Sequence, residues 1–197
     1  MRIGIDISQL AFEDTGFANY LENLLNALLK IDSRNEYVLF FSSLRRNFPR
    51  PRQAKRGGQF SIFPSIPSSG PRGNFQSNPN VKIKTFKFPL TLLDLLWNRL
   101  HIAPIEWFIG DVDVFITSDW TEPPTRQAKK ATILYDLAVY KYPKETDKKI
   151  VETQKRKLHW VKKESDLIFC ISEATKKDAM EILGIDSEKL SVSHPGI

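Results

Sequence analysis

Hydrophobic and polar positions follow two alternating patterns along most of the chain. Short segments rich in apolar residues are typical of buried strands, and they occur at residues 2–7, 37–41, 81–86, 112–116, 131–134, 167–171 and 190–192. Apolar residues spaced three and four positions apart predict helices at residues 16–30, 92–109 with a break at Pro104, 148–163 and 173–183. Because strands alternate with helices, the pattern predicts an α/β domain with a mostly parallel sheet and helices on both faces.

Residues 43–80 interrupt this alternation. They contain six prolines and four glycines and show no apolar period. Between Tyr37 and Leu93 there is no Asp or Glu but there are ten Lys and Arg, so the rest of the chain is net negative although the whole carries +6. We expect residues 43–80 to form a long basic loop that is rich in Pro, Gly and Ser and is disordered. Its charge would attract phosphates, acidic lipid headgroups or nucleic acid, and charge alone does not choose among them.

Several classes of protein do not fit this composition. No apolar run approaches the roughly 20 residues of a membrane-spanning helix, and the first residues read as a strand rather than as a signal peptide. The single cysteine, Cys170, lies in an apolar run, which predicts a buried structural thiol and excludes an internal disulfide. These features favour a cytoplasmic protein.

No pattern in the sequence predicts a metal site. The histidines, His101, His159 and His194, are far apart and lack the spacing of metal ligands. Asp111 and Asp113 have a D-x-D spacing that can hold a cation, but they open an apolar strand and this spacing is common by chance. We therefore expect neither a metal nor another cofactor.

Candidate chemistry lies where strands end, because open parallel sheets bind ligands at the carboxyl edge. The first such turn leads into a helix at Thr15 and Gly16. Free amides at a helix N-terminus attract phosphate, and a glycine permits the close approach of a ligand. The alternative is that Gly16 only begins a packed helix.

Further strand ends carry polar side chains. The strand at residues 131–134 runs into Tyr135 and Asp136, for which a turn-forming aspartate is the alternative interpretation. Another strand is followed by three secondary candidates for contacting a ligand: Ser118, Asp119 and Trp120. Ser172 and Glu173 stand at the start of a helix and are also candidates, and capping of that helix is the simpler explanation.

Several short segments, in this order, resemble the N-terminal half of group 1 (family 4) retaining glycosyltransferases. They are residues 2–6 with 15–20 and 24–28, residues 136–138 with 142–143, residues 171–175 with 183–184, and residues 192–196. The resemblance covers both ends of the chain and hardly touches residues 43–107. Enzymes of this family have the GT-B fold, in which two Rossmann-like domains face a cleft. The resemblance implies that residues 1–197 form the acceptor-side Rossmann-like domain, that 193–197 begin the interdomain linker, and that the C-terminal donor domain is absent from this sequence.

The resemblance also implies roles for individual residues. In such enzymes the glycine loop after the first strand faces the reacting sugar and diphosphate, which here corresponds to Gly16, Phe17, Ala18 and Asn19. The family usually has a second glycine where Ala18 stands and often an arginine where Asn19 stands, which weakens the case for a side-chain contact to phosphate. Tyr135 and Asp136 are the catalytic candidates, with Tyr135 where the family commonly has histidine. Tyrosine can hydrogen-bond a sugar hydroxyl, but its unperturbed pKa near 10 makes it a poor proton carrier.

The activity that the resemblance implies is transfer of a hexose, with retention, from a nucleotide sugar to a polysaccharide or lipid-linked glycan. In such enzymes the departing diphosphate can take the acceptor proton, and the groups that stabilise its charge lie mostly in the second domain. We therefore expect the chain alone to be inactive. The alternative is a non-catalytic anion- or nucleotide-binding Rossmann-like domain.

The expected partners are the nucleotide sugar, a glycan or glycolipid acceptor and the missing donor domain. The basic helix at residues 148–163 also suggests a peripheral contact with an anionic membrane, although a solvated helix face explains the same charges. Nucleic acid is not expected, because the sequence has no recognised binding module and its charge lies in a loop. A cytoplasmic, membrane-associated protein fits these expectations.

Overall fold

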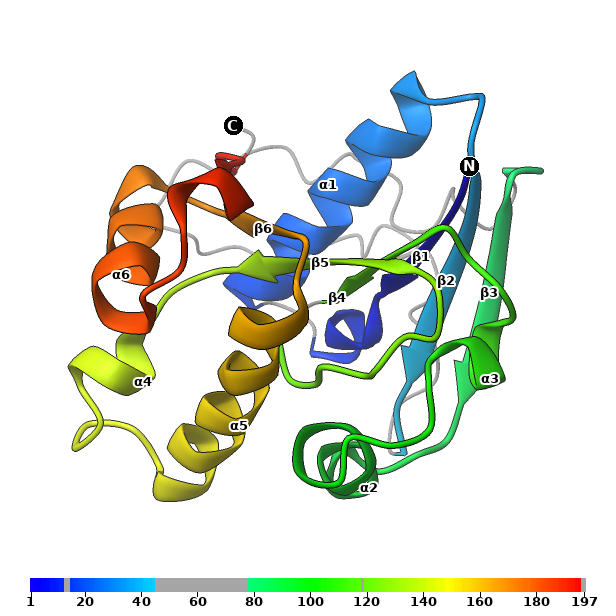
Figure 1. Ribbon diagram of the computed structural model, residues 1–197. Coiled ribbons are helices and arrows are strands. Elements are labelled where there is room, and N and C mark those ends of the chain that lie inside the picture. Colours follow the sequence, from blue (N-terminus) through cyan, green and yellow to red (C-terminus); the bar gives the residue numbers. More distant parts are fainter. Residues whose placement is uncertain (13–14, 45–77, 118, 196–197) are drawn as a thin grey trace, which may run out of the picture.

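The structure, a computed structural model, describes residues 1–12, 15–44, 78–117 and 119–195. Within these ranges seven strands form one sheet in which every neighbouring pair is parallel (Figure 1). The order along the sheet is β3-β2-β1-β4-β5-β6-β7. The strands are β1 Arg2–Asp6, β2 Glu36–Ser42, β3 Val81–Phe86, β4 Val114–Thr117, β5 Lys129–Leu134, β6 Leu167–Cys170 and β7 Leu190–Val192. The predicted α/β class and parallel sheet are confirmed.

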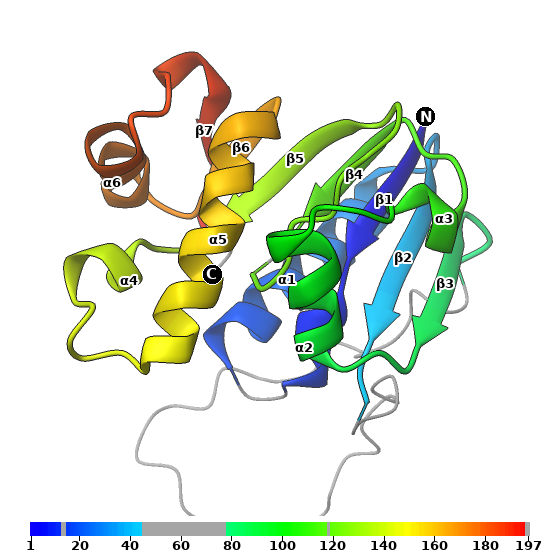
Figure 2. The same cartoon turned by 60° about the horizontal axis from the view of Figure 1, so that its bottom comes forward.

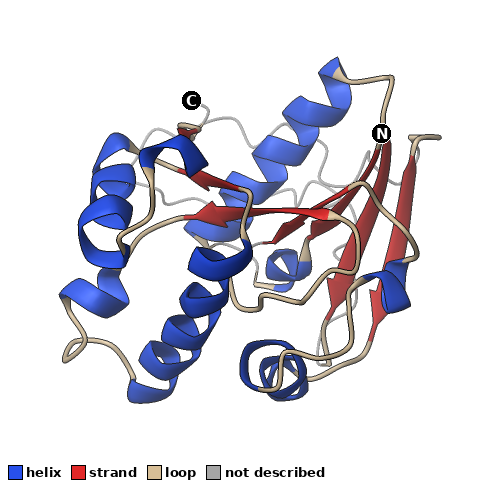
Figure 3. Cartoon of the chain, in the orientation of Figure 1, coloured by secondary structure: helices blue, strands red, loops and turns tan. Residues whose placement is uncertain are grey.

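Helices cover both faces of the sheet (Figure 2). On one face, Ile5 of β1 packs in the same core cluster as Leu21 and Leu25 of α1. On the opposite face, Phe115 of β4 packs with Trp97 in a second cluster, and β6 packs against α5 and α6 in a third. Figure 3 shows how helices and strands alternate; the helices are α1 Gly16–Ile31, α2 Leu90–Leu93, α3 Glu106–Ile109, α4 Ala138–Lys141, α5 Lys148–Glu164 and α6 Glu173–Leu183.

Capping residues explain where two of these helices begin and end. Thr15 precedes α1, and its side-chain oxygen accepts a hydrogen bond from the amide of Ala18 (3.2 Å). Ser172 caps α6 in the same way, accepting from the amide of Thr175 (3.1 Å). Gly184 ends α6 in the left-handed conformation, with a φ of 63°. The cap at Ser172 that the sequence offers as an explanation is therefore confirmed.

The order of the strands reverses between β1 and β4. The chain moves from β1 outward to β2 and β3 and then returns to the other side of β1, where Ile3 pairs with both Tyr37 and Val114. At such a reversal, open α/β sheets bind ligands outside the carboxyl ends of their strands. Because the sheet is parallel throughout, every turn that follows a strand lies at this one edge.

The segment between β3 and β4 differs from the prediction of one broken helix. It consists of α2, a π-helical segment at Asp94–Arg99, and α3. Between the last two, His101 and Ala103 adopt positive φ values of 51° and 62°. The carbonyl of Ala103 accepts a hydrogen bond from Trp97 Nε1 (2.9 Å), so a local side-chain contact accompanies a backbone conformation that non-glycine residues seldom adopt.

The turn after β1 contains a buried 3-10 helix, Ser8–Ala11. Of the expected basic loop at residues 43–80, residues 45–77 lie outside the described residues. Among the residues that the structure describes, no helix is both long and apolar enough to cross a bilayer.

Candidate functional site

A cavity of about 270 Å³ opens at the carboxyl edge of the sheet, next to the reversal of strand order. It lies between the ends of β4 and β5 and the helices α4 and α5, which Figure 2 shows beside the end of β5. We call it the edge pocket. Its lining residues are Phe17, Asp119, Trp120, Ile133, Leu134, Tyr135, Asp136, Ala138, Val139, Thr146, Ile150, Gln154, Lys157 and Leu158.

The edge pocket brings together five of the residues that the sequence marks as candidates: Phe17, Asp119, Trp120, Tyr135 and Asp136. They come from three turns, after β1, β4 and β5, that are far apart in sequence. Residues from these three turns therefore line one cavity. Their roles in binding or catalysis stay predictions.

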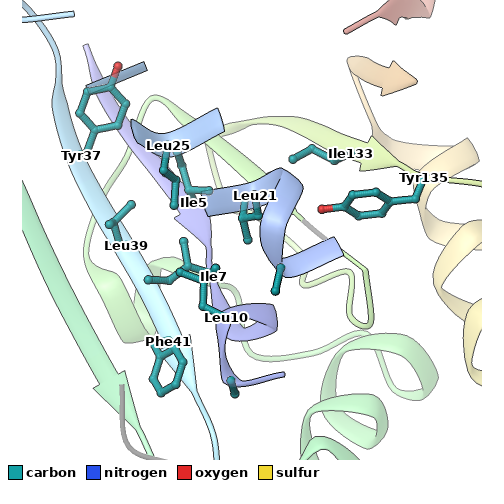
Figure 4. Packing of buried hydrophobic residues seen from close by; sticks show 12 residues of the cluster. Ile5, Ile7, Leu10, Leu21, Leu25, Tyr37, Leu39, Phe41, Ile133 and Tyr135 are labelled. Carbon is teal, nitrogen blue, oxygen red and sulfur yellow. The ribbon is translucent and has the colours of Figure 1, made fainter. Parts of the chain in front are cut away.

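Tyr135 is a buried residue, 4% exposed, at the end of β5. Its hydroxyl donates a hydrogen bond to Gln9 Oε1 (3.0 Å), in the 3-10 helix after β1. The rings of Phe17 and Tyr20 meet the Tyr135 ring edge to face, at centroid distances of 4.7 and 5.6 Å. Figure 4 shows the hydroxyl directed toward α1. The Tyr135 side chain thus ties the end of β5 to the start of the chain, and Tyr135 also lines the pocket.

Asp136 is exposed and stands at the solvent side of the edge pocket. Its Oδ1 accepts a hydrogen bond from the amide of Ala138 (2.9 Å), which stabilises the turn into α4. The turn-forming role that the sequence offered as an alternative is therefore present. It leaves the carboxylate at the mouth of the pocket, where it contributes negative charge.

The other residues of the first turn lie beside the pocket without lining it. Gly16 is the exposed first residue of α1, and an added Cβ would meet nothing within 4 Å. Ala18 is 5% exposed and belongs to the core, while the amide of Asn19 donates to the carbonyl of Thr15 (3.0 Å). Among the residues of this turn that the structure describes, only Phe17 lines the edge pocket.

The start of α6 also lies outside the edge pocket. Ser172 caps the helix and Glu173 is exposed, and neither lines the cavity. A link to the pocket exists through Thr175, whose hydroxyl donates to the carbonyl of Tyr135 (3.0 Å). The capping explanation thus accounts for Ser172. Ser118, the remaining candidate, lies outside the described residues.

Two polar residues of α5 that line the pocket, Gln154 and Lys157, are absent from the sequence-based candidates. The sequence predicts that Lys157 lies on a solvated or membrane-facing basic surface of the helix. This prediction is wrong, because Lys157 is buried, with 2% of its surface exposed. Gln154 Nε2 donates to both the carbonyl oxygen and Oδ1 of Asp119 (3.0 and 3.2 Å). Helical spacing places these two residues on the same face of α5 as the buried Val151 and Val161, so the sequence does contain a signal for their inward position.

A cluster of charged residues borders the edge pocket, and we call it the charge cluster: Asp6, Glu122, Lys130 and Lys157, which are buried, and Asp119, which is partly exposed. Glu122 is fully buried, accepts a hydrogen bond from Thr117 Oγ1 (2.6 Å) and pairs with Lys130 Nζ (3.3 Å). Lys157 Nζ donates to Thr132 Oγ1 (3.4 Å). Thr117 ends β4, pairs with Thr132 of the neighbouring β5, and hydrogen-bonds it through the side chains. Strands β1, β4 and β5 and the loop after β4 therefore converge with α5 on this cluster.

Burial governs the protonation of the charge cluster. It raises the pKa of Asp6 and of Asp119, and the positive charge of Lys157 partly opposes both shifts. It also lowers the pKa of Lys157, against the combined attraction of Glu122, Asp119 and Asp6. Lys157 is thus surrounded by three carboxyl groups, which can balance its charge without any bound anion.

Helix α5 is fastened along its length, so the wall that it gives to the edge pocket is held in position. Arg156 Nη2 pairs with Asp94 Oδ2 (2.9 Å) in the π-helical segment. Toward its C-terminal end, Trp160 stacks on the ring of His101 at a centroid distance of 3.6 Å. His101 Nε2 in turn lies 3.0 Å from both carboxylate oxygens of Glu164.

A second cavity, of about 210 Å³, lies between α1 and the sheet. Leu and Ile side chains form most of its wall, and its polar end is the hydroxyl of Tyr20, which donates to the carbonyl of Ser193 (3.2 Å). This cavity offers few hydrogen-bonding groups to a sugar or a phosphate. The edge pocket is therefore the stronger candidate for a polar ligand.

The described residues contain no group of three His, Cys, Asp or Glu side chains arranged to hold a metal ion. Asp113, from the D-x-D pattern, lies just before β4, at the amino edge of the sheet, and its Oδ2 accepts a hydrogen bond from the amide of Arg2 (2.7 Å). No family of known proteins matches this chain, and no curated protein is detectably similar to it in sequence.

Proposed function

We propose that this chain is the acceptor-binding half of a retaining hexosyltransferase, which moves a hexose from a nucleotide sugar to a polysaccharide or lipid-linked glycan. The observation that carries the proposal is the edge pocket, which joins Asp119, Trp120, Tyr135 and Asp136 at the ligand-binding edge of a doubly wound sheet. We propose that the acceptor sugar binds there. Such an enzyme would work in the cytoplasm, in peripheral contact with the membrane that carries its acceptor.

The size and lining of the edge pocket support a sugar ring as its ligand. At about 270 Å³ it lies just below the range of about 300–1,000 Å³ that is typical of sites for drug-sized molecules, so it suits one ring rather than a whole nucleotide sugar. Trp120 offers an aromatic surface, and Asp119 and Lys157 offer an acceptor and a donor of hydrogen bonds. Apolar walls with a few polar groups are typical of ligand sites.

The nucleotide sugar would then bind mainly to a second domain. The exposed start of α1, beside the edge pocket, faces the same edge and would meet the sugar and diphosphate of the donor. We propose that transfer needs both halves and that this chain alone has no activity. In this scheme no metal ion or cofactor takes part, and the departing diphosphate accepts the proton of the acceptor hydroxyl.

The second candidate is a non-catalytic anion- or nucleotide-binding domain. The helix N-termini at the carboxyl edge favour it, because they carry partial positive charge. The three carboxyl groups around Lys157 weigh against an anion in the edge pocket itself. The two candidates predict different ligands for the same chain.

Binding measured by NMR separates them. The indole N–H signal of Trp120, assigned with Trp120→Phe, reports on the edge pocket because this side chain lines it. We expect methyl hexopyranosides to shift this signal at millimolar concentration and nucleotide sugars to leave it unchanged. If nucleotide sugars shift the signal and hexosides do not, the proposed acceptor site is wrong and the second candidate is favoured. A longer reading frame encoding a second α/β domain should add transfer activity.

A further inference from the structure

The edge pocket contains a cation whose charge is already balanced. Lys157 is 2% exposed and lines the pocket, and its Nζ donates to Thr132 Oγ1 (3.4 Å). Asp119, which also lines the pocket, and the fully buried Glu122 both attract it, and so does Asp6. A phosphate or carboxylate entering the pocket would therefore find no uncompensated positive charge.

Negative charge also stands along the path of an incoming anion. Asp119 and Asp136 both line the edge pocket, and Asp136 is exposed at its mouth. Like charges within about 4–6 Å of each other are unfavourable, and burial strengthens the effect. An anionic group would lose its hydration in the pocket and would gain repulsion from these two carboxylates.

The polar groups of the pocket suit hydroxyls instead. A lysine Nζ only donates hydrogen bonds and a carboxylate only accepts them, whereas a sugar hydroxyl does both. Gln154 holds the Asp119 carboxylate in place by donating to its Oδ1 (3.2 Å) and to its backbone carbonyl (3.0 Å). Adjacent ring hydroxyls can accept from Lys157 and donate to Asp119, while Trp120 covers part of the ring.

We infer that the edge pocket selects an uncharged sugar ring of the acceptor and rejects phosphorylated or uronic acid sugars. Lys157 and Asp119 form hydrogen bonds with neighbouring hydroxyls of that ring. This inference rests on the proposed function, because it assigns the chemical class of the acceptor at the proposed site. It makes Lys157 a specificity-determining residue rather than part of a solvated helix surface.

Four related sugars of different charge test the inference on the wild-type chain. They are a methyl hexopyranoside, its uronic acid, its 6-phosphate and its 2-amino analogue, each titrated while the Trp120 indole signal is followed. We expect the neutral sugar to bind at least tenfold more tightly than either anionic sugar, and the amino sugar to bind at least as tightly as the neutral one. An anionic sugar that binds as tightly as the neutral one overturns the inference.

Variants test the two residues separately. Lys157→Met should weaken binding of the neutral sugar at least tenfold, whereas Lys155→Met, on the exposed side of the same helix, should leave it unchanged. Asp119→Asn removes a negative charge and should therefore reduce the ratio of the affinity for the neutral sugar to the affinity for the anionic sugars. An unchanged preference in Asp119→Asn contradicts the inference even if Lys157→Met does not fold. If none of the four sugars shifts the Trp120 signal, the proposed function fails instead, so the two failures are distinguishable.

Discussion

Replacing Lys157 by methionine nearly preserves the volume of a buried side chain and removes its charge. In the native protein this charge lies among Asp6, Asp119 and Glu122, and it partly offsets the effect of burial on the first two. Without it, these carboxyl groups must either stay ionised in a poorly solvated environment or take up protons. We therefore expect Lys157→Met to lower the free energy of unfolding, by an amount that depends on pH.

The magnitude follows from the partners that remain. Breaking a buried ion pair by removing one member costs about 3–5 kcal/mol. Glu122 would keep its pair with Lys130 (3.3 Å), and Asp6 would keep its hydrogen bond from the amide of Ser8 (2.9 Å), so the low end of this range applies. A loss of about 3 kcal/mol at pH 7.5 corresponds to a fall in Tm of about 6–12 °C for a chain of this size.

The dependence on pH has a definite sign. The pKa of Asp6 and that of Asp119 are already raised by burial, and removal of Lys157 raises both further above the value near 4 of the unfolded chain. Below these raised values the folded variant binds protons that the unfolded chain does not, so the penalty shrinks as pH falls toward 4. Each carboxyl group can recover up to about 1.4 kcal/mol per pH unit.

Urea unfolding at pH 7.5 and pH 5.0, followed by circular dichroism, checks this expectation. The difference between wild type and Lys157→Met should be about 3 kcal/mol at the higher pH and clearly smaller at the lower. Lys155→Met is the matched control, since Lys155 is exposed and its Nζ lies 5.2 Å from the centre of the Tyr140 ring, and it should cost about 1 kcal/mol or less. Equal losses in both variants, or a loss from Lys157→Met that does not change with pH, would refute the reasoning.

Three other predictions concern backbone packing, thiol reactivity and the first turn. Gly4→Ala should destabilise the chain by about 1–3 kcal/mol in urea unfolding, because the new Cβ would lie 2.7 Å from Phe115 Cδ2, and the penalty should shrink in a Phe115→Leu background. Burial raises the pKa of Cys170 to about 11, so native protein should not react with DTNB at pH 8 and urea-unfolded protein should react fully. Gly16→Val should keep the fold, with a melting temperature within a few degrees of wild type, because nothing lies within 4 Å of the added Cβ. The same substitution should abolish transfer in the complete enzyme. Wild-type turnover would show that this turn is not part of the site.

The sequence predicts most of the fold because burial leaves a periodic trace in it. The strand at residues 81–86 and the helix at residues 173–183 are found with the predicted bounds. The segment around His101 could not be predicted in this way. His101 and the π-helical segment before it contact Trp160 and Glu164, about 60 residues away in the chain. Local propensity carries no information about such partners.

In the candidate site, too, some residues could be predicted from the sequence and others could not. Asp119, Tyr135 and Asp136 could be predicted, because parallel strands bring their ends to one edge whatever the details of packing. Glu122 could not, since nothing in the loop around it indicates that Lys130 and Thr117 will surround it. Lys157 was predictable from helical spacing, but the number of lysines on α5 favoured a solvated face.

The position of β1 has a consequence for synthesis of the chain. One side of β1 pairs with β2, which follows soon after it, but the other side pairs with β4, whose first residue emerges about 70 residues later than the end of β2. At about 5–20 residues per second, a nascent β1–α1–β2 unit would wait roughly 4–14 seconds with an open hydrogen-bonding edge at the middle of the future sheet. Ribosome-bound chains that stop before Val114 should therefore be the species most prone to pair with one another and the ones that chaperones hold.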